Sequence, residues 1–119
     1  MLATPTIKPF DEAAANARQA ADIAAARHVR ALCARASALR NPAETENCWG
    51  PFIRMQSEIL AVIVQIEDDF CREFAIFYTI EMCMDANDLT LSRSLLTQLT
   101  IIYFKIRVMQ LYPHLLSLQ

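Results

Sequence analysis

Large apolar residues recur at steps of three and four along most of this chain, which is the spacing of amphipathic α-helices. The spacing predicts three helices, over residues 11–40, 51–86 and 91–112. Prolines fall at the boundaries between these segments, where proline stops or begins a helix. Residues 1–10 show no such pattern, so we expect an extended or disordered arm followed by a single helical domain over 11–119.

The first expected helix has two unlike halves. Its N-terminal half, EAAANARQAADIAAAR, contains Ile23 as its only large apolar residue. We therefore expect this half to project or fray unless a partner covers it. The C-terminal half is better anchored, because apolar residues follow at helical spacing: Val29, Leu32, Cys33, Ala36 and Leu39.

The second and third expected helices carry the apolar surfaces that decide the architecture. Four aromatic residues cover more than one face of the second helix: Phe70, Phe74, Phe77 and Tyr78. Five residues of the third helix alternate steps of four and three, as in a coiled-coil seam: Leu95, Leu99, Ile102, Ile106 and Met109. One side of these surfaces is expected in the core and the other against a partner or a second copy. For the four aromatic residues, the alternative is that they simply form part of the protein's own core.

These patterns predict an all-α fold with three helices. The second and third helices are expected to form a long antiparallel hairpin, and the first helix packs on it through its C-terminal half. Two copies would then complete a helical bundle as a homodimer.

The stretch NPAETENCWGPF connects the first and second expected helices. We expect Trp49 to fill one end of the core from this loop; the alternative is an exposed anchor for a partner. The helix–NPAE–helix layout resembles, in layout alone and over about half of the chain, small helical subunits and chaperones of bacterial secretion systems. That resemblance implies a non-catalytic role in assembly.

Composition supports a helical protein with surplus apolar surface. The chain of 119 residues contains a single glycine, which is few for the turns of a sheet protein. Its hydrophobic content of 55% exceeds the roughly 45–50% that is usual for globular domains. Because a domain this small buries a limited fraction of its surface, the surplus favours self-association or a partner groove.

Charge differs between the segments although the net charge is only −2. Residues 1–46 carry six basic and five acidic groups, residues 47–88 two basic and eight acidic, and residues 89–119 three basic and none acidic. This order favours an acidic middle helix that lies between an arginine-bearing first helix and a basic third helix.

The acidic cluster QIEDDFCREF interrupts the most apolar part of the chain. On one continuous helix, Asp68, Asp69 and Arg72 share a polar stripe, within which three- and four-residue ion pairs form. Glu67 points to the opposite, apolar face, so we expect it in a buried or interfacial salt bridge, with Arg107 as the candidate partner. Lys105, an arginine of the first helix, and the hydroxyls of Tyr103 and Tyr112 are further candidates.

The sequence shows no pattern typical of a catalytic or metal site. Four-helix carboxylate metal sites use Glu-x-x-His, which is absent. The spacings of Cys33, Cys48, Cys71 and Cys83 match no zinc motif, and one glycine cannot form a phosphate-binding loop. We therefore expect no enzyme activity, no cofactor and no metal. The absence of a secretory signal pattern and of about 18 continuous apolar residues predicts a cytoplasmic protein with reduced thiols and no membrane span.

The function that the sequence favours is a non-catalytic interaction protein, namely an adaptor, chaperone or assembly subunit that binds a protein partner through an apolar helical surface. The alternative is a small nucleic-acid-binding or regulatory protein that uses the first helix. Five arginines there support the alternative: Arg18, Arg27, Arg30, Arg35 and Arg40. However, they are scattered around the helix and no aromatic residue lies between them for base stacking.

Overall fold

The computed structural model describes residues 11–39 and 49–117, in which all regular secondary structure is helical. The helices are α1 (Glu12–Leu39), α2 (Trp49–Ile63), α3 (Asp69–Asp85), α4 (Leu89–Leu96), α5 (Ile102–Leu111) and α6 (His114–Ser117). The predicted all-α class is therefore confirmed. The arm predicted over residues 1–10 lies outside the described residues. Within the described segments, no helix combines the length and apolar character needed to cross a membrane.

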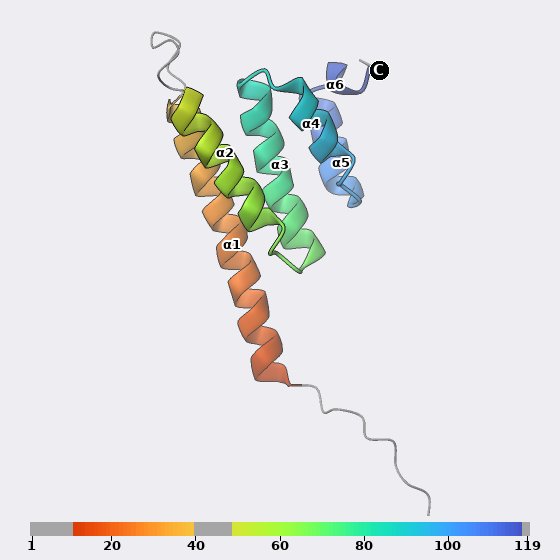
Figure 1. The fold of residues 1–119 in the computed structure, drawn as a ribbon. Coiled ribbons are helices and arrows are strands. Elements are labelled where there is room, and N and C mark those ends of the chain that lie inside the picture. The colour runs from red at the N-terminus through yellow and green to blue at the C-terminus, as the bar shows by residue number, and fades with distance from the viewer. Residues whose placement is uncertain (1–10, 40–48, 118–119) are drawn as a thin grey trace, which may run out of the picture.

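The central helix is α3, which packs against α1 and α2 on one side and α4 and α5 on the other (Figure 1). From α1 to α5, successive helices run in opposite directions along the molecule (Figure 1). The acidic α3 thus lies between the arginine-bearing α1 and the basic C-terminal helices, as the segment charges favoured.

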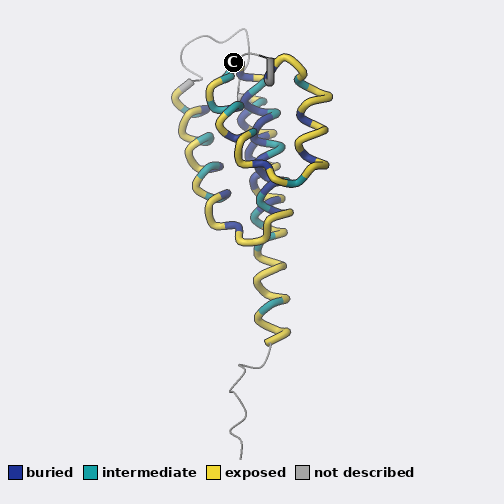
Figure 2. Tube along the Cα trace, turned by 90° about the vertical axis from the view of Figure 1, so that its right-hand side faces the viewer, coloured by how far each residue is buried: buried dark blue, intermediate teal, exposed yellow. Residues whose placement is uncertain are grey.

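The two halves of α1 differ as the sequence predicts. Val29, Leu32, Cys33 and Ala36 are buried in the core, whereas the side chain of Leu39 lies outside the described residues. The N-terminal half is almost entirely exposed and extends beyond the other helices (Figure 2). The core also contains apolar residues from each of the helices α2 to α6, among them Ile59, Ile76, Ile80, Leu95, Val108 and Leu115.

The prediction of one helix over 51–86 is wrong, because the chain leaves helical geometry after Ile63 and resumes it at Asp69. β-Branched residues at positions 62, 63 and 64 weaken helix propensity before the break. The side chain of Asp68 then caps α3 by accepting the backbone N–H of Cys71 at 2.8 Å. A capped start here favours a new helix over continuation of the old one.

A second carboxylate stabilises this break from a distant part of the chain. Asp22 of α1 accepts the backbone N–H groups of Asp68 at 2.9 Å and of Glu67 at 3.4 Å. From the other side, Arg72 donates to the carbonyls of Ile66 and Glu67, both at 3.3 Å. The connection between α2 and α3 is therefore held by side chains of α1 and α3.

The prediction of one helix over 91–112 is also wrong, because residues 97–101 separate α4 from α5. The N-cap residue of α5, Ile101, offers no capping side chain. Glu73 of α3 fills that role: its carboxylate accepts the Ile101 N–H at 2.8 Å, the Thr100 hydroxyl at 2.7 Å and the Thr100 N–H. A helix start without a local cap is thus supplied with one by another helix.

The end of α3 lies close to the predicted position and has a well-defined cap. Asn87 adopts a left-handed conformation with φ 59°, which asparagine tolerates better than most residues. The Asp88 N–H donates to the Cys83 carbonyl at 2.8 Å and the Asn87 N–H to the Met84 carbonyl at 3.0 Å, the two bonds of a Schellman motif. Asp88 then caps α4 by accepting the Leu91 N–H at 3.1 Å.

These breaks replace the predicted three-helix arrangement. In place of one long hairpin between residues 51–86 and 91–112, α2 and α3 turn back on each other, and so do α3 and α4 (Figure 1). The chain therefore forms a row of shorter helices, with α3 in contact with its neighbours on both sides.

Candidate functional site

Aromatic side chains of α3 and α5 form a connected row across the middle of the molecule. Phe104 of α5 lies with its ring centroid 5.3 Å from that of Phe70 and 6.0 Å from that of Phe77. Tyr78 continues the row, 5.5 Å from Phe77 and 4.8 Å from Phe74. These are the spacings of favourable aromatic pairs, so the row fixes α5 on α3.

The row reaches α1 through an arginine. The guanidinium carbon of Arg30 lies 4.9 Å from the centre of the Tyr78 ring, within the range of a cation–π interaction. This contact places one positive charge of α1 next to the aromatic side of α3.

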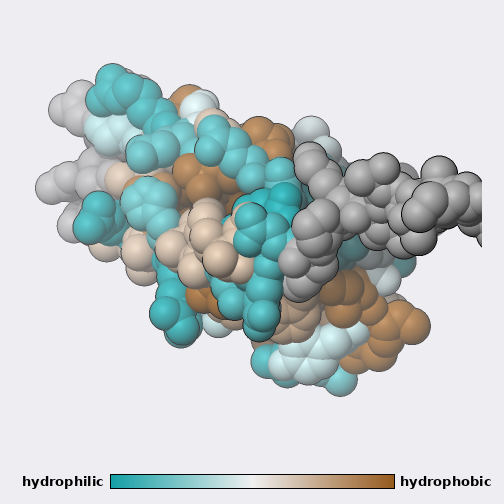
Figure 3. Space-filling view, turned by 90° about the horizontal axis from the view of Figure 1, so that it is seen from below, coloured by the Kyte–Doolittle hydropathy of each residue, from teal (hydrophilic) through white to brown (hydrophobic). Residues whose placement is uncertain are grey.

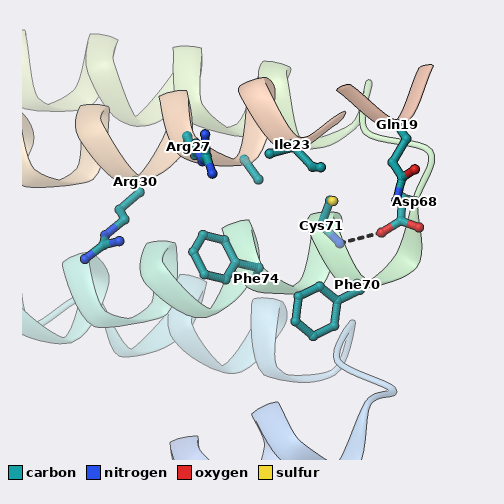
Figure 4. A pocket seen from close by; sticks show the side chains of 9 residues that line it. Gln19, Ile23, Arg27, Arg30, Asp68, Phe70, Cys71 and Phe74 are labelled. Carbon is teal, nitrogen blue, oxygen red and sulfur yellow. Dashed lines mark hydrogen bonds between the residues drawn. The ribbon is translucent and has the colours of Figure 1, made fainter. Parts of the chain in front are cut away.

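A groove of about 560 Å³ lies between α1 and α3, and we call it the α1–α3 groove. Figure 4 shows Gln19, Ile23, Arg27 and Arg30 on the α1 wall, and Phe70, Cys71 and Phe74 on the α3 wall. Asp68 closes one end. Phe70 is 56% exposed and Ile23 37%, so large apolar side chains meet solvent in the groove. The groove therefore combines apolar walls with two cationic side chains.

The polar groups at the closed end of the groove have fixed charge states. The backbone N–H of Cys71 donates to the Asp68 carboxylate and holds the pKa of that carboxyl below its usual value. Burial, reinforced by the neighbouring charge of Asp68, raises the pKa of the Cys71 thiol to about 11. At neutral pH, the groove thus presents a carboxylate and a protonated thiol at this end.

A second apolar surface lies on the outer side of α5. Ile102, Tyr103, Ile106 and Met109 are all exposed, Ile102 by 69% and Met109 by 47%, and we call this set the α5 face. Next to it, Leu96, Thr97, Lys105 and Met109 line a hollow of about 280 Å³ between α4 and α5. In the view from below, hydrophobic side chains gather on the side of the molecule where these helices lie (Figure 3).

The predicted partner surface is divided by the structure. Phe70, Ile102, Ile106 and Met109 are exposed; Phe74, Phe77 and Tyr78 are half-buried; Leu95 and Leu99 are buried in the core. The predicted seam fails as one stripe because α4 and α5 are separate helices. Leu95 and Leu99 therefore pack inward while the residues of α5 that follow them in the seam face outward. Trp49 is the first residue of α2, and its side chain lies outside the described residues.

The prediction that Glu67 is buried is wrong. Glu67 is exposed in the connection between α2 and α3, and Arg107 is exposed on α5. The buried acid is Glu73, which is 1% exposed. Burial alone would raise the pKa of Glu73, but hydrogen bonds from Ile101 and Thr100 outweigh it, so the pKa lies below its usual value. Asp69 and Arg72 form the predicted three-residue ion pair.

Arg107 of α5 interacts with Glu81 of α3 rather than with Glu67. Burial and the nearby Asp85 raise the pKa of Glu81, while the positive charges of Arg107 and Arg30 act in the opposite direction. Burial also raises the pKa of the Tyr112 hydroxyl, and the negative charges of Glu81 and Asp85 add to this. Glu81 and Asp85 of α3 therefore lie near two arginines, Arg30 of α1 and Arg107 of α5.

The described cysteines are buried and weakly acidic. Burial raises the pKa of Cys33 to about 11 and that of Cys83 to about 12. Thiols with these values stay protonated at neutral pH and are poor nucleophiles. In the part of the chain that the structure describes, no group of three or more histidine, cysteine, aspartate or glutamate residues lies close enough to bind a metal ion.

Two features of the structure could not be predicted from the sequence. The role of Glu73 depends on contacts with residues 27 and 28 positions later. The α1–α3 groove combines Ile23 and Arg27 with Phe70 and Phe74, which are remote in sequence. The local signal for the α5 face was the spacing of Ile102, Ile106 and Met109 at steps of four and three.

Comparison of the chain with protein-family models, with curated proteins and with solved structures finds no match in any of the three.

Proposed function

We propose that this chain is a non-catalytic helical interaction protein, an adaptor, chaperone or assembly subunit, which receives a helix of another chain in the α1–α3 groove. The observation that carries the proposal is the exposure of Ile23 and Phe70 on facing walls of that groove. Grooves of this kind bind the apolar side of an amphipathic helix.

The projecting half of α1 supports a helix as the occupant. This half has few neighbours of its own, so its stability depends on helix propensity more than on packing. A helix lying in the groove and along α1 would cover Ile23 and give this half a packing partner. Arg27 and Arg30 line the same groove, so carboxylates on the incoming helix would find positive charge there.

The thiol chemistry supports a binding role over a catalytic one. Cys71 is the nucleophilic side chain in the groove wall, and its raised pKa keeps it protonated at neutral pH. The groove thus offers apolar contact and charge, which are the components of a protein interface.

The test compares one isoleucine in the groove with one outside it. The tagged full-length chain and its Ile23→Asp and Ile53→Asp variants are cross-linked in the cells of origin and purified. Ile53 is 53% exposed on α2 and does not line the groove, so it is the matched control. We expect a protein that cross-links to the wild type and to Ile53→Asp, and at least tenfold less to Ile23→Asp. Equal recovery with all three chains would contradict the proposal.

The predicted homodimer is part of the same proposal. Light scattering of the purified wild type and Ile23→Asp shows whether the incoming helix belongs to a second copy. A mass of two chains that falls to one in the variant identifies a homodimer. A single-chain mass for both assigns the groove to a different protein.

A further inference from the structure

We infer that the α5 face is a second docking surface, separate from the α1–α3 groove, and that its occupant is a helix of another protein with an apolar stripe flanked by carboxylates. This goes beyond the proposed function, because a chain with two docking surfaces can join two partners.

The shape of the α5 face fits a helix. Ile102, Ile106 and Met109 follow one another at steps of four and three, so at ~100° per residue they form a straight ridge on one side of α5. Tyr103 widens this ridge on one edge. The hollow of about 280 Å³ beside Met109 can accept an apolar side chain from a helix packed along the ridge. Apolar anchors of this kind supply most of the affinity of a helix interface.

The charges beside the ridge specify the chemistry of the occupant. On the helical wheel, Lys105 lies on the Met109 edge of the ridge and Arg107 on the Tyr103 edge, and both are exposed. Lys105 also lines the hollow. Residues 89–119 contain three basic residues and no acidic residue, so the side chains of this part of the chain supply no carboxylate. Helices that pack along an apolar ridge pair opposite charges at the flanking positions, which calls for carboxylates on the occupant.

A second copy paired through the same face is disfavoured by these charges. A two-fold interface sets the same patch of both chains together, so Lys105 and Arg107 would meet a surface that carries the same two cations. Such like-charge contacts oppose association. Glu81 of α3 interacts with Arg107 and reduces the effect of its positive charge. Lys105 therefore contributes the larger part of the preference for an acidic partner helix over a second copy of this chain.

The inference is tested with two fluorescently labelled helical peptides of three heptads, which share a leucine stripe and carry either glutamate or lysine at the flanking positions. Fluorescence anisotropy is measured with the full-length chain carrying Ile23→Asp, so that the α1–α3 groove does not bind the peptides, and the variants below are made in the same background. It is expected to show about tenfold tighter binding of the glutamate peptide, reduced by added salt. The double variant K105E/R107E should prefer the lysine peptide, and Ile106→Asp should bind neither. Arg54→Glu, which reverses an exposed charge on α2, is the matched control and should bind the peptides as the chain with Ile23→Asp alone does.

Four results would overturn the inference: equal affinity for the two peptides, binding of neither, tighter binding of the lysine peptide, or an unchanged preference in K105E/R107E. A wild-type dimer that Ile106→Asp converts to a monomer would also overturn it, because the occupant would then be a second copy. Because Ile23→Asp is present throughout the peptide measurements, binding to the α1–α3 groove does not contribute to them. Failure at the α5 face is thereby distinguished from failure at the α1–α3 groove.

Discussion

Replacement of Glu73 tests whether one buried carboxylate decides where α5 begins. Glu73→Ala removes an acceptor of three hydrogen bonds and leaves the N–H groups of Thr100 and Ile101 without their protein partner. Hydrogen bonds to a charged group are each worth about 1.5–3 kcal/mol, but Thr100 is exposed and can partly turn to water. We therefore expect Glu73→Ala to lower the free energy of unfolding by about 3–5 kcal/mol.

Glu73→Gln is the milder form of the same change. The amide keeps one oxygen for the two N–H donors, and the Thr100 hydroxyl can rotate to accept from the new NH₂ group. The loss is then mainly the negative charge, so we expect about 1–2 kcal/mol. Small domains are stable by only about 5–15 kcal/mol, so a loss of about 3–5 kcal/mol in Glu73→Ala can prevent folding. The smaller loss in Glu73→Gln leaves a folded chain whose stability can be measured.

The pH dependence gives a second, independent measure. The pKa of Glu73 is lower in the folded chain than in the unfolded chain, so the unfolded state binds more protons in acid. The stabilisation from Glu73 is complete above the ordinary glutamate pKa of about 4.3 and is lost as the pH falls through the folded pKa. The difference in stability between the wild type and Glu73→Gln should therefore be largest near pH 7 and shrink below about pH 4.

Urea unfolding followed by circular dichroism at several pH values measures these differences. Glu67→Gln is the matched control, because it makes the same chemical change at an exposed site in the same acidic cluster, and it should shift stability by less than about 0.5 kcal/mol. Equal effects of Glu67→Gln and Glu73→Gln, or a loss in Glu73→Gln that does not vary with pH, would refute the assignment of Glu73 as the cap of α5.

Three further predictions concern the ends of helices and the thiols. Asp22→Ala should lower the free energy of unfolding in urea by about 1–2 kcal/mol and speed amide hydrogen exchange at Glu67 and Asp68. The control Asp11→Ala removes only an exposed hydrogen bond from the Ala14 N–H, so it should leave the exchange of those two amides unchanged. Asn87→Gly should change the free energy of unfolding little, whereas Asn87→Val should lower it by about 1–2 kcal/mol in thermal unfolding, because a φ of 59° disfavours a β-branched residue. Equal effects of the two substitutions would argue against the left-handed conformation of Asn87. In a Cys48→Ser variant, the thiols of Cys33, Cys71 and Cys83 should react slowly with a thiol reagent at pH 7 in the folded chain and rapidly in urea. Fast reaction of any of these thiols in the folded chain would contradict their burial and raised pKa values.

The sequence was a good guide to α1 and to the outer limits of the later helices. The contrast between an alanine-rich half and an apolar half of α1 is a local property, and the structure reproduces it. The end of α3 was also predictable, since the Asp-Ala-Asn-Asp stretch contains both a left-handed residue and a cap.

The interior breaks were not predictable, because their causes lie elsewhere in the chain. Asp22 is 46 positions from the Asp68 N–H that it accepts, and Glu73 is 28 positions from Ile101. Once residues 51–86 are assumed to form one helix, the helical wheel places Glu67 on the wrong face. The same assumption for residues 91–112 joins Leu99 and Ile102 in one stripe, although they face opposite environments.

The candidate surfaces were predictable to different degrees. Local spacing grouped Ile102, Ile106 and Met109 of α5 on one stripe, but it joined them to Leu95 and Leu99, which are buried. The α1–α3 groove required knowledge that the start of α3 lies beside the middle of α1. Hydrophobic periodicity gives the faces of individual helices, but it does not say which faces become neighbours.

The capping of α5 by a carboxylate of α3 has a consequence for the order of folding. An isolated helix of ten residues, such as α5, is unstable in water, and its first turn is the costly part to form. Here the first turn is completed by Glu73, which is available only after α3 has formed and docked. The C-terminal part of the chain should therefore fold onto a finished α3, and its first turn should open only when that contact is lost. Short helices that would fray independently are in this way joined into one cooperative unit.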